Sequence, residues 1–225
     1  MFAAACFRNR HAIYGIIGSS QVGPNQVSCT SGTAFMIVPG VLVTAAHLVH
    51  VGCDAAQATH AWFEVIRAPD VGQHMERAAL LAQDPARDLA LLTLKEPRSS
   101  ACVTLEEKIV AAGTGCGSLG FPLAKVTFTP QGKVFQLVER FQGAHISAFY
   151  ASGPFSHYET DSLMYRGSSG CPGFLADGRV FAMHVRSVVE ETPEGKPGET
   201  RLGISLWVPA GDIIRFAEKS GVKIA

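Results

Sequence analysis

Short apolar runs, separated by glycine, proline and polar clusters, recur along the whole chain. Runs of this kind are typical of β-strands, and many of them in succession favour an all-β sandwich or barrel. In the first half they predict strands at His11–Ile17, Thr33–Val38, Val41–Thr44, Ala61–Arg67, Ala78–Ala82 and Leu89–Leu94. In the second half they predict strands at Val126–Phe128, Lys133–Val138, His145–Tyr150, Arg179–Val185 and Gly203–Val208.

Three breaks in this pattern predict how the strands connect. Pro39-Gly40 lies between two apolar runs and predicts a tight turn, because proline fixes φ and glycine accepts a positive φ. The polar, turn-rich start of residues 95–112 predicts a crossing between two halves, which divides the chain into residues 1–100 and 101–225. Residues 188–200 are charged and rich in proline and glycine, which predicts a solvated loop.

The end of the chain changes to a helical period. Asp212 is positioned to cap a helix there, and Gly221 is positioned to end it. The apolar face of this helix consists of Ile213, Ile214, Phe216 and Ala217. The expected fold class is therefore all-β with a C-terminal α-helix.

The composition is that of a globular protein and narrows the classes of partner. A length of 225 residues is enough for one or two domains with an ordinary core. Of these residues, 47% are hydrophobic and 17% are charged, as in a globular protein. Nineteen basic residues balance nineteen acidic ones, and no dense Lys/Arg cluster is present. We therefore expect neither nucleic acid nor a membrane surface as a partner.

No segment has the pattern of a membrane span or a secretory signal. The longest uncharged apolar run, Ala34–Val49, is broken by Pro39-Gly40. At the N-terminus the apolar run Phe2–Phe7 comes before Arg8 and Arg10, which reverses the order found in signal peptides. We expect a cytoplasmic protein, or a mature fragment whose signal has been removed.

The cysteines and histidines do not predict a disulfide framework, a metal or a cofactor. Six cysteines are too few and too scattered for a disulfide-built domain, so we expect free, mostly buried thiols. His47, His50 and Cys53 have zinc-like spacing, but no fourth ligand is evident. Gly115–Gly120 fits a dinucleotide-binding pattern, yet Phe121-Pro122 follows it, where no helix can begin.

One segment carries a candidate nucleophile. Ser169 lies in the turn Gly167-Ser168-Ser169-Gly170, and a serine hydroxyl attacks well only when a neighbouring base removes its proton. The flanking glycines keep bulky side chains away from the backbone N–H groups of Gly167 and Ser169, which are the candidate oxyanion hole. The alternative for this segment alone is an ordinary flexible turn.

Two upstream segments supply the partners that such a nucleophile needs. His47 follows small residues at the end of a predicted strand and is the candidate base; its alternative is a packed or surface histidine. Asp88 opens the apolar run Leu89–Leu92 and is the candidate orienting acid. Asp70 and Asp84 compete for this role, but a rigid strand next to Asp88 would hold its carboxylate in place.

With these residues, the chain resembles the chymotrypsin-like (trypsin-fold) serine peptidases, and within them the bacterial trypsin-like, Deg-type (high-temperature-requirement) branch. The chain order His, Asp, Ser is the order of that fold. The matching segments, which span about residues 11–210, are Ser31-Gly32-Thr33-Ala34-Phe35, Thr44-Ala45-Ala46-His47, Asp88-Leu89-Ala90-Leu91-Leu92, Leu119-Gly120-Phe121-Pro122, Gly167-Ser168-Ser169-Gly170-Cys171-Pro172 and Gly203-Ile204-Ser205.

The resemblance implies two six-stranded antiparallel β-barrels with an active cleft between them and the C-terminal helix outside. It implies a serine endopeptidase that needs no cofactor and acts on proteins or peptides. Secreted members carry two bridged cysteines where this chain has Ser31 and Leu48, which supports a reducing compartment. Zymogen-activated members carry an aspartate at the position of Ser168, so we expect no activation by N-terminal cleavage.

By the same resemblance, the substrate pocket is lined by Leu163, Met164, Tyr165, Arg166, His184, Val185, Arg186, Ser187, Gly203, Ile204 and Ser205. Leu163 stands where trypsins have an aspartate, so a preference for basic residues is not expected. His184 and Ser187 match positions that glutamyl endopeptidases use, whereas Met164 replaces a third, polar one. Two preferences stay open for the P1 residue, which supplies the attacked carbonyl: Glu or Gln, or a small or medium apolar residue. His184 as a packed strand histidine is the alternative to its role in specificity.

The strand Val185–Ser187 is expected to pair with the substrate backbone. A different class of function uses the same fold. The chain is then a non-catalytic or latent module that binds peptides or protein partners, under the control of a regulatory partner or an additional domain.

Overall fold

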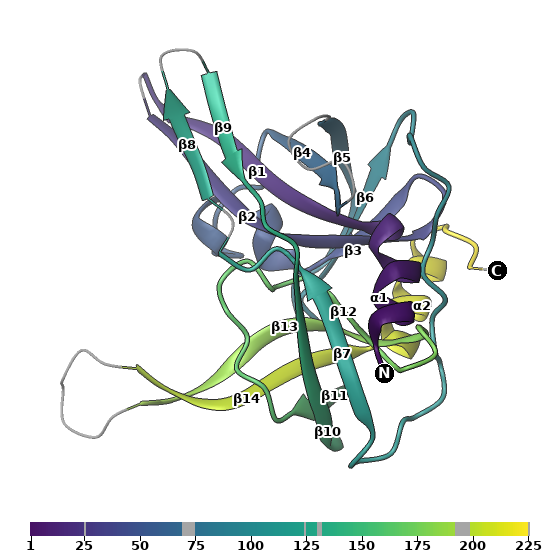
Figure 1. Cartoon of the computed structure of the whole chain (residues 1–225). Helices are drawn as coiled ribbons and strands as arrows, with labels where there is room; N and C mark the ends of the chain where they lie inside the picture. The colour runs from purple at the N-terminus through teal and green to yellow at the C-terminus, as the bar shows by residue number, and fades with distance from the viewer. Residues whose placement is uncertain (25, 69–74, 124, 130–131, 192–198, 225) are drawn as a thin grey trace.

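The computed structural model describes residues 1–24, 26–68, 75–123, 125–129, 132–191 and 199–224, and it consists mainly of antiparallel strands (Figure 1). Six strands close a first barrel in the order β1-β2-β3-β6-β5-β4, and six close a second barrel in the order β10-β11-β14-β13-β12-β7. The first comprises β1 (Ile13–Gly23), β2 (Gln26–Val38), β3 (Val41–Thr44), β4 (Trp62–Arg67), β5 (Glu76–Asp84) and β6 (Leu89–Leu94). The second comprises β7 (Gly115–Gly120), β10 (Arg140–Ser152), β11 (Phe155–Thr160), β12 (Pro172–Phe174), β13 (Val180–Glu191) and β14 (Glu199–Pro209). With the C-terminal helix, this confirms the expected fold class.

The strands β7, β11 and β12 do not follow from the apolar pattern. β7 reads Gly-Cys-Gly-Ser-Leu-Gly, a composition that disfavours strands when taken alone. Its Gly117 lies under the ring of Phe141, where a Cβ would stand 2.5 Å from a ring carbon. The packing of a partner ring, rather than local propensity, explains a glycine at this position.

Two predicted strands of the second half lie outside its barrel. β8 (Lys125–Thr129) and β9 (Gly132–Gln136) pair only with each other and form a separate two-stranded sheet. In Figure 1 this hairpin projects beside β1 and β2. The second barrel closes without it, because β7, β11 and β12 complete the set of six.

The predicted loop at residues 188–200 is wrong at both ends. β13 continues to Glu191 and β14 begins at Glu199, with Glu191 opposite Glu199. The β-branched pair Val188-Val189 extends the first strand beyond the point where charge and proline suggested a loop. Residues 192–198 lie outside the described part of the chain.

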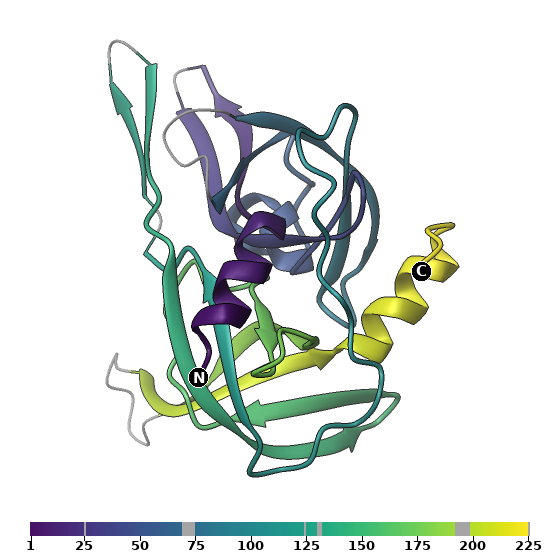
Figure 2. The ribbon, with the colours of Figure 1, turned by 45° about the vertical axis from the view of Figure 1, so that its right-hand side comes forward.

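Two helices lie outside the barrels. The helix α1 (Ala3–Asn9), which the sequence did not predict, packs on the second barrel through Phe2, whose ring centroid is 5.8 Å from that of Phe141. It leads into the short 3₁₀ turn η1 (Arg10–Ala12) and then into β1. The C-terminal helix α2 (Ala210–Lys219) contacts β6 of the first barrel and β13 and β14 of the second (Figure 2).

The start of α2 differs from the prediction. Its N-cap is Pro209, without a side-chain cap, and Asp212 lies inside the first turn. There the carboxylate of Asp212 is buried and accepts a hydrogen bond from Arg215 at 2.6 Å, in a position that the helix dipole favours. Gly221, with φ of +85°, follows the last turn as expected.

The core of the second barrel contains three aromatic rings in contact with one another. Tyr158 meets Phe181 edge-on at 5.2 Å, and Phe181 lies 6.2 Å from Trp207. Their polar groups are satisfied, because Trp207 Nε1 donates to Thr160 Oγ1 and Tyr158 Oη accepts from the Val110 amide, both at 2.9 Å. Phe181 belongs to β13, the strand that also carries His184.

The cysteines are unpaired, but most are not buried. Cys116 and Cys171 are buried, two are half-buried, and Cys53 and Cys102 are exposed, so the expectation of mostly buried thiols is wrong. Burial raises the pKa of Cys116 to about 12 and raises the pKa of Cys171 as well. Among the residues that the structure describes, no helix combines the length and the apolar character needed to cross a membrane.

Candidate active site

His47 and Asp88 are brought together by the pairing of β3 with β6. Thr44 at the end of β3 lies opposite Ala90 near the start of β6, so the turn that follows β3 lies next to Asp88, the residue before β6. His47 lies in the 3₁₀ turn η2 (Ala46–Val49), which a second turn, η3 (Val51–Cys53), follows. Asp88 has φ of +56°, a left-handed conformation that aspartate adopts more readily than most residues.

The carboxylate of Asp88 holds His47 by two hydrogen bonds. Its Oδ1 accepts from the His47 backbone N–H, and its Oδ2 accepts from the ring at Nδ1, both at 2.8 Å. The backbone oxygen of Asp88 also accepts from the Ala46 amide at 3.1 Å. With the proton on Nδ1, the Nε2 of His47 carries a lone pair and can act as a base.

Ser169 lies in the loop between β11 and β12, and Thr33 of the first barrel anchors this loop. Thr33 is fully buried, and its backbone N–H donates to the Ser169 carbonyl at 2.9 Å. Its hydroxyl donates to the Gly167 carbonyl at 2.9 Å and accepts from the Phe121 amide at 3.0 Å. A single residue thus fixes the nucleophile loop of one barrel to β2 of the other.

The hydroxyl of Ser169 is not bonded to His47. It donates to the backbone oxygen of Val185 at 3.3 Å, and within the described residues no hydrogen bond joins it to the imidazole. At that length an O–H···O bond is weak, so the hydroxyl can exchange partners at small cost. Ser169, His47 and Asp88 nevertheless line the same cavity.

The backbone amides of the loop leave two donors unused. The amides of Ser168, Gly170 and Cys171 donate to carbonyls at 2.8–3.0 Å, whereas those of Gly167 and Ser169 have no acceptor among the described residues. Gly167 has φ of +90°, and a Cβ there would stand 2.5 Å from the Phe121 carbonyl oxygen. The two N–H groups predicted to receive an oxyanion are therefore free to do so.

The cavity that these residues share has a volume of about 350 Å³ and is called the first cavity below. Seven of the predicted pocket residues line it: Met164, Tyr165, Arg166, His184, Val185, Arg186 and Ser187. Leu163, Gly203 and Ser205 are not among the residues that line it, and neither is Ile204. Ser205 is fully buried, and its hydroxyl donates to the Ser162 carbonyl at 2.6 Å, so this hydroxyl is already engaged within the protein.

His184 is the most strongly perturbed group in the first cavity. Its side chain is 2% exposed, its ring meets Trp207 edge-on at 5.1 Å, and neither ring nitrogen has a hydrogen-bond partner among the described residues. Burial is the main cause that lowers the pKa of His184 to about 3; the Ser168 backbone opposes this shift, and smaller effects come from His47, which lowers the pKa, and from the Arg186 backbone, which raises it. The ring is therefore neutral at physiological pH and has one donor and one acceptor to offer.

A second cavity, of about 280 Å³, adjoins the first and shares His47, Asp88, Val185 and Arg186 with it. Its remaining lining is Ala46, Cys53, Ala55, Pro85, Ala86, Arg87 and His157. His157 belongs to β11 and is half-buried. Cys53, Arg87 and His157 come from three separate elements, and no motif in the sequence links them.

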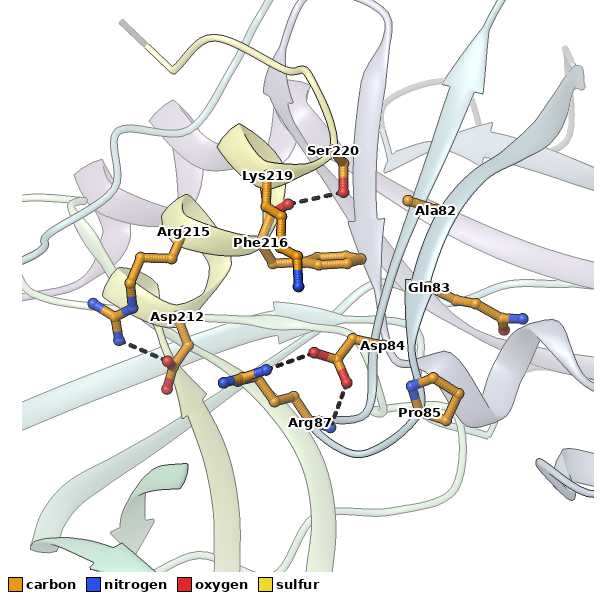
Figure 3. Close-up of a pocket in the computed structure, with 10 residues that line it drawn as sticks. All are labelled: Ala82, Gln83, Asp84, Pro85, Arg87, Asp212, Arg215, Phe216, Lys219 and Ser220. Atoms are coloured by element: carbon orange, nitrogen blue, oxygen red, sulfur yellow. Dashed lines mark hydrogen bonds and ion pairs between the residues drawn. The ribbon is translucent and has the colours of Figure 1, made fainter. Parts of the chain in front are cut away.

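A third cavity, of about 530 Å³, is larger than the first two and lies away from Ser169, between α2 and the turn from β5 to β6 (Figure 3). Two ion pairs line it: Arg87 with Asp84 at 2.7 Å and Arg215 with Asp212 at 2.6 Å. Asp84, a competitor of Asp88 in the sequence, is thus engaged by Arg87, and Asp70 lies outside the described residues. Neither His47 nor Ser169 reaches this cavity.

The described residues contain no group of three or more His, Cys, Asp or Glu side chains placed to hold a metal ion. His47 and His50 of the zinc-like spacing have other partners. His47 binds Asp88, and His50 Nδ1 binds the Gln57 carbonyl at 3.0 Å.

The chain matches a family of known proteins. A family model described as a trypsin-like peptidase domain matches residues 32–183, which include His47, Asp88 and Ser169. No curated protein matches the chain. The family match does not separate branches of the family, so membership of the Deg-type branch stays a prediction.

Proposed function

The chain belongs to the trypsin-like peptidase family, and on this basis we propose that it is a serine endopeptidase that acts through His47, Asp88 and Ser169. The observation that carries the proposal is the pair of 2.8 Å hydrogen bonds from His47 to Asp88, which turns Nδ1 of the ring toward the carboxylate and leaves Nε2 as the nitrogen that can take the nucleophile's proton. Ser169 in the same cavity and two unused amides beside it support the proposal. Protein or peptide chains are the proposed substrates.

In the proposed reaction, Ser169 Oγ attacks the scissile carbonyl while its proton passes to His47 Nε2. The carbonyl oxygen becomes an oxyanion and accepts from the amides of Gly167 and Ser169. The C–N bond then breaks, and His47 returns the proton to the leaving amine. Water attacks the acyl-enzyme, gives one proton to His47 and releases the acid, and Ser169 recovers its proton.

The bond from Ser169 to Val185 belongs to the resting state in this proposal. Val185 lies on the strand that is expected to pair with the substrate backbone, so a substrate N–H competes for the same carbonyl oxygen. Once displaced, the hydroxyl rotates about χ1 toward His47. The exchange costs little, because a 3.3 Å bond is replaced by another hydrogen bond.

For the P1 residue we propose glutamine or glutamate. A buried imidazole with two unpartnered nitrogens is costly unless a ligand supplies partners, and His184 borders the first cavity. An amide or carboxyl group can accept from one ring nitrogen. The buried Met164 in the same wall supports the alternative preference for a small or medium apolar residue.

The resting position of the Ser169 hydroxyl favours one other function, a latent or non-catalytic module that binds peptides or protein partners. A fluorophosphonate probe separates the two. Labelling of the wild type that is lost in Ser169→Ala and strongly reduced in Asp88→Asn supports the endopeptidase. A folded wild type that neither labels nor cleaves, while Ser169→Ala still binds peptides, supports the binding module.

A panel of fluorogenic peptides tests the P1 preference. Peptides that differ only at P1, with Gln, Glu, Ala, Leu or Lys, should give the highest kcat/KM for Gln or Glu and the lowest for Lys. Highest turnover of the Ala or Leu peptide would overturn the role of His184 and support the apolar alternative. We also propose a cytoplasmic location, which the six unpaired cysteines support.

A further inference from the structure

The charged residues around the two adjoining cavities are strongly unequal in sign. Among the described residues that line them, three are arginines (Arg87, Arg166 and Arg186) and one is an aspartate, Asp88. Both carboxylate oxygens of Asp88 accept from His47, so Asp88 forms no direct ion pair with any of the three arginines. The cleft therefore presents excess positive charge, although the whole chain has none.

The three arginines differ in how far their charge is engaged. Arg87 donates to Asp84 at 2.7 Å and lies over the ring of Phe155 at 5.0 Å. Arg166 and Arg186 are exposed and have no carboxylate partner in the described part of the chain. Only these two have guanidinium groups that are free to receive an anion.

Of the two, Arg186 borders both cavities, and its charge reaches the second. Burial lowers the pKa of His157, and the Arg186 guanidinium lowers it further. Asp212 acts on His157 in the opposite direction, but its carboxylate is already paired with Arg215. Arg186 is thus the unpaired cation of the second cavity, whereas the carboxylate in its described lining, Asp88, is hydrogen-bonded to His47 and acts in the opposite direction on Cys53.

The register of an extended substrate determines which residue enters the second cavity. Side chains of an extended chain point alternately to opposite sides. If the P1 side chain enters the first cavity beside Ser169 and His184, the next residue toward the N-terminus, P2, points to the other side. The second cavity adjoins the first and shares His47 and Arg186 with it, so we assign the P2 side chain to it.

We propose that the second cavity is a subsite for an acidic side chain at P2, held by the Arg186 guanidinium, and that the substrates are acidic peptide segments. This inference rests on the proposed function for the direction of the bound peptide. Binding itself does not require catalysis. The subsite therefore also exists if the protein is a non-catalytic module.

The expected preference is moderate because Arg186 is exposed. A solvent-exposed guanidinium–carboxylate pair corresponds to about a 1.4- to fivefold change in binding. Salt should weaken it, because exposed charges are screened at about 0.5 M ionic strength. A preference that comes from shape alone would not respond to salt in this way.

The test uses the full chain with Ser169→Ala, so that peptides bind without being cleaved. Fluorescent peptides with Gln at P1 carry Glu, Gln or Lys at P2, and fluorescence anisotropy gives Kd. The Glu peptide should bind about 1.4- to fivefold more tightly than the Gln peptide, and the Lys peptide more weakly than either. Arg186→Gln should bring the Glu-to-Gln ratio close to one, and Arg186→Glu should favour Lys.

Arg98→Gln is the matched control, because Arg98 is equally exposed but lines neither cavity. It should keep the wild-type ratio. A Glu-to-Gln ratio near one with Arg186 intact, or a ratio that Arg186→Gln does not change, would overturn the acidic subsite. Parallel kcat/KM values with Ser169 present separate the two proposals: cleavage without an acidic preference overturns only the subsite, whereas an acidic binding preference without cleavage overturns only the endopeptidase.

Discussion

Thr33→Val is the substitution that most directly tests how the two barrels share one active site. Valine has nearly the shape of threonine but lacks the hydroxyl that binds the Gly167 carbonyl and the Phe121 amide. The backbone bond from residue 33 to the Ser169 carbonyl remains possible. The change therefore removes two hydrogen bonds at a fully buried position without opening a large cavity.

Both stability and activity should fall, for separable reasons. Each polar group left without a partner costs about 1–3 kcal/mol, so we expect a loss of about 2–4 kcal/mol, since water can reach half-buried Gly167. Complete loss of one oxyanion donor lowers kcat by about 10²–10³. Thr33→Val should loosen the loop without removing an N–H donor completely, so we expect the rate of fluorophosphonate labelling to fall by about 10- to 100-fold.

Thr160→Val is the matched control. Thr160 is also fully buried, and its hydroxyl makes two hydrogen bonds, with Trp207 Nε1 at 2.9 Å and Ser162 Oγ at 3.1 Å. It should lose similar stability in urea denaturation but label at close to the wild-type rate. Thr33→Ser keeps the hydroxyl and should restore labelling. Equal labelling of folded Thr33→Val and wild type would refute the positioning role, and an equal loss in both valine variants would attribute the effect to stability.

Three further predictions concern the triad, acid stability and thiol reactivity. Asp88→Asn should lower kcat on peptides by about 10⁴, because an amide no longer selects the Nδ1–H tautomer of the histidine; a reduction below tenfold contradicts the triad. Burial lowers the folded-state pKa of His184 to about 3, so below about pH 6.5 the unfolded chain binds a proton that the folded chain does not. As the pH falls from about 6.5 to about 4, this group should therefore lower the free energy of unfolding by about 1.4 kcal/mol per pH unit. His184→Phe should remove this pH dependence of the free energy of unfolding, measured by urea titration. A disulfide reagent should modify exposed Cys53 in the folded protein but Cys171 only after unfolding, since burial raises the pKa of Cys171; equal rates measured by mass spectrometry contradict the burial order.

The sequence predicts strands best where a strand is apolar on both faces. The predicted bounds of β3 and β6 agree with the structure, because both are short runs of aliphatic residues delimited by clear breaks. β7 is missed because its glycines disfavour a strand locally, whereas Gly117 is required by the ring of Phe141 on another strand. β11, Phe-Ser-His-Tyr-Glu-Thr, is missed because its single large buried residue, Tyr158, gives too little periodicity.

In the site as well, the sequence predicts what neighbouring strands bring together and misses what depends on contacts between distant segments. The bond from His47 to Asp88 could be anticipated, since each residue adjoins a strand and the strands are neighbours. The second cavity could not be anticipated. Cys53, Arg87 and His157 meet only after both barrels close, and each looks like an isolated polar residue in its own segment.

The direction in which the two N–H groups of the candidate oxyanion hole point depends on contacts with residues outside the glycine turn. In a trans peptide the C=O and the N–H point opposite ways, so holding a carbonyl also directs the next amide. The Arg166 carbonyl accepts from the Leu123 amide at 2.6 Å, and this orients the N–H of Gly167. The Ser168 carbonyl accepts from the Cys171 amide at 2.9 Å, and this orients the N–H of Ser169. The glycines permit the turn, but a residue more than forty positions upstream sets the direction of one of its two donors.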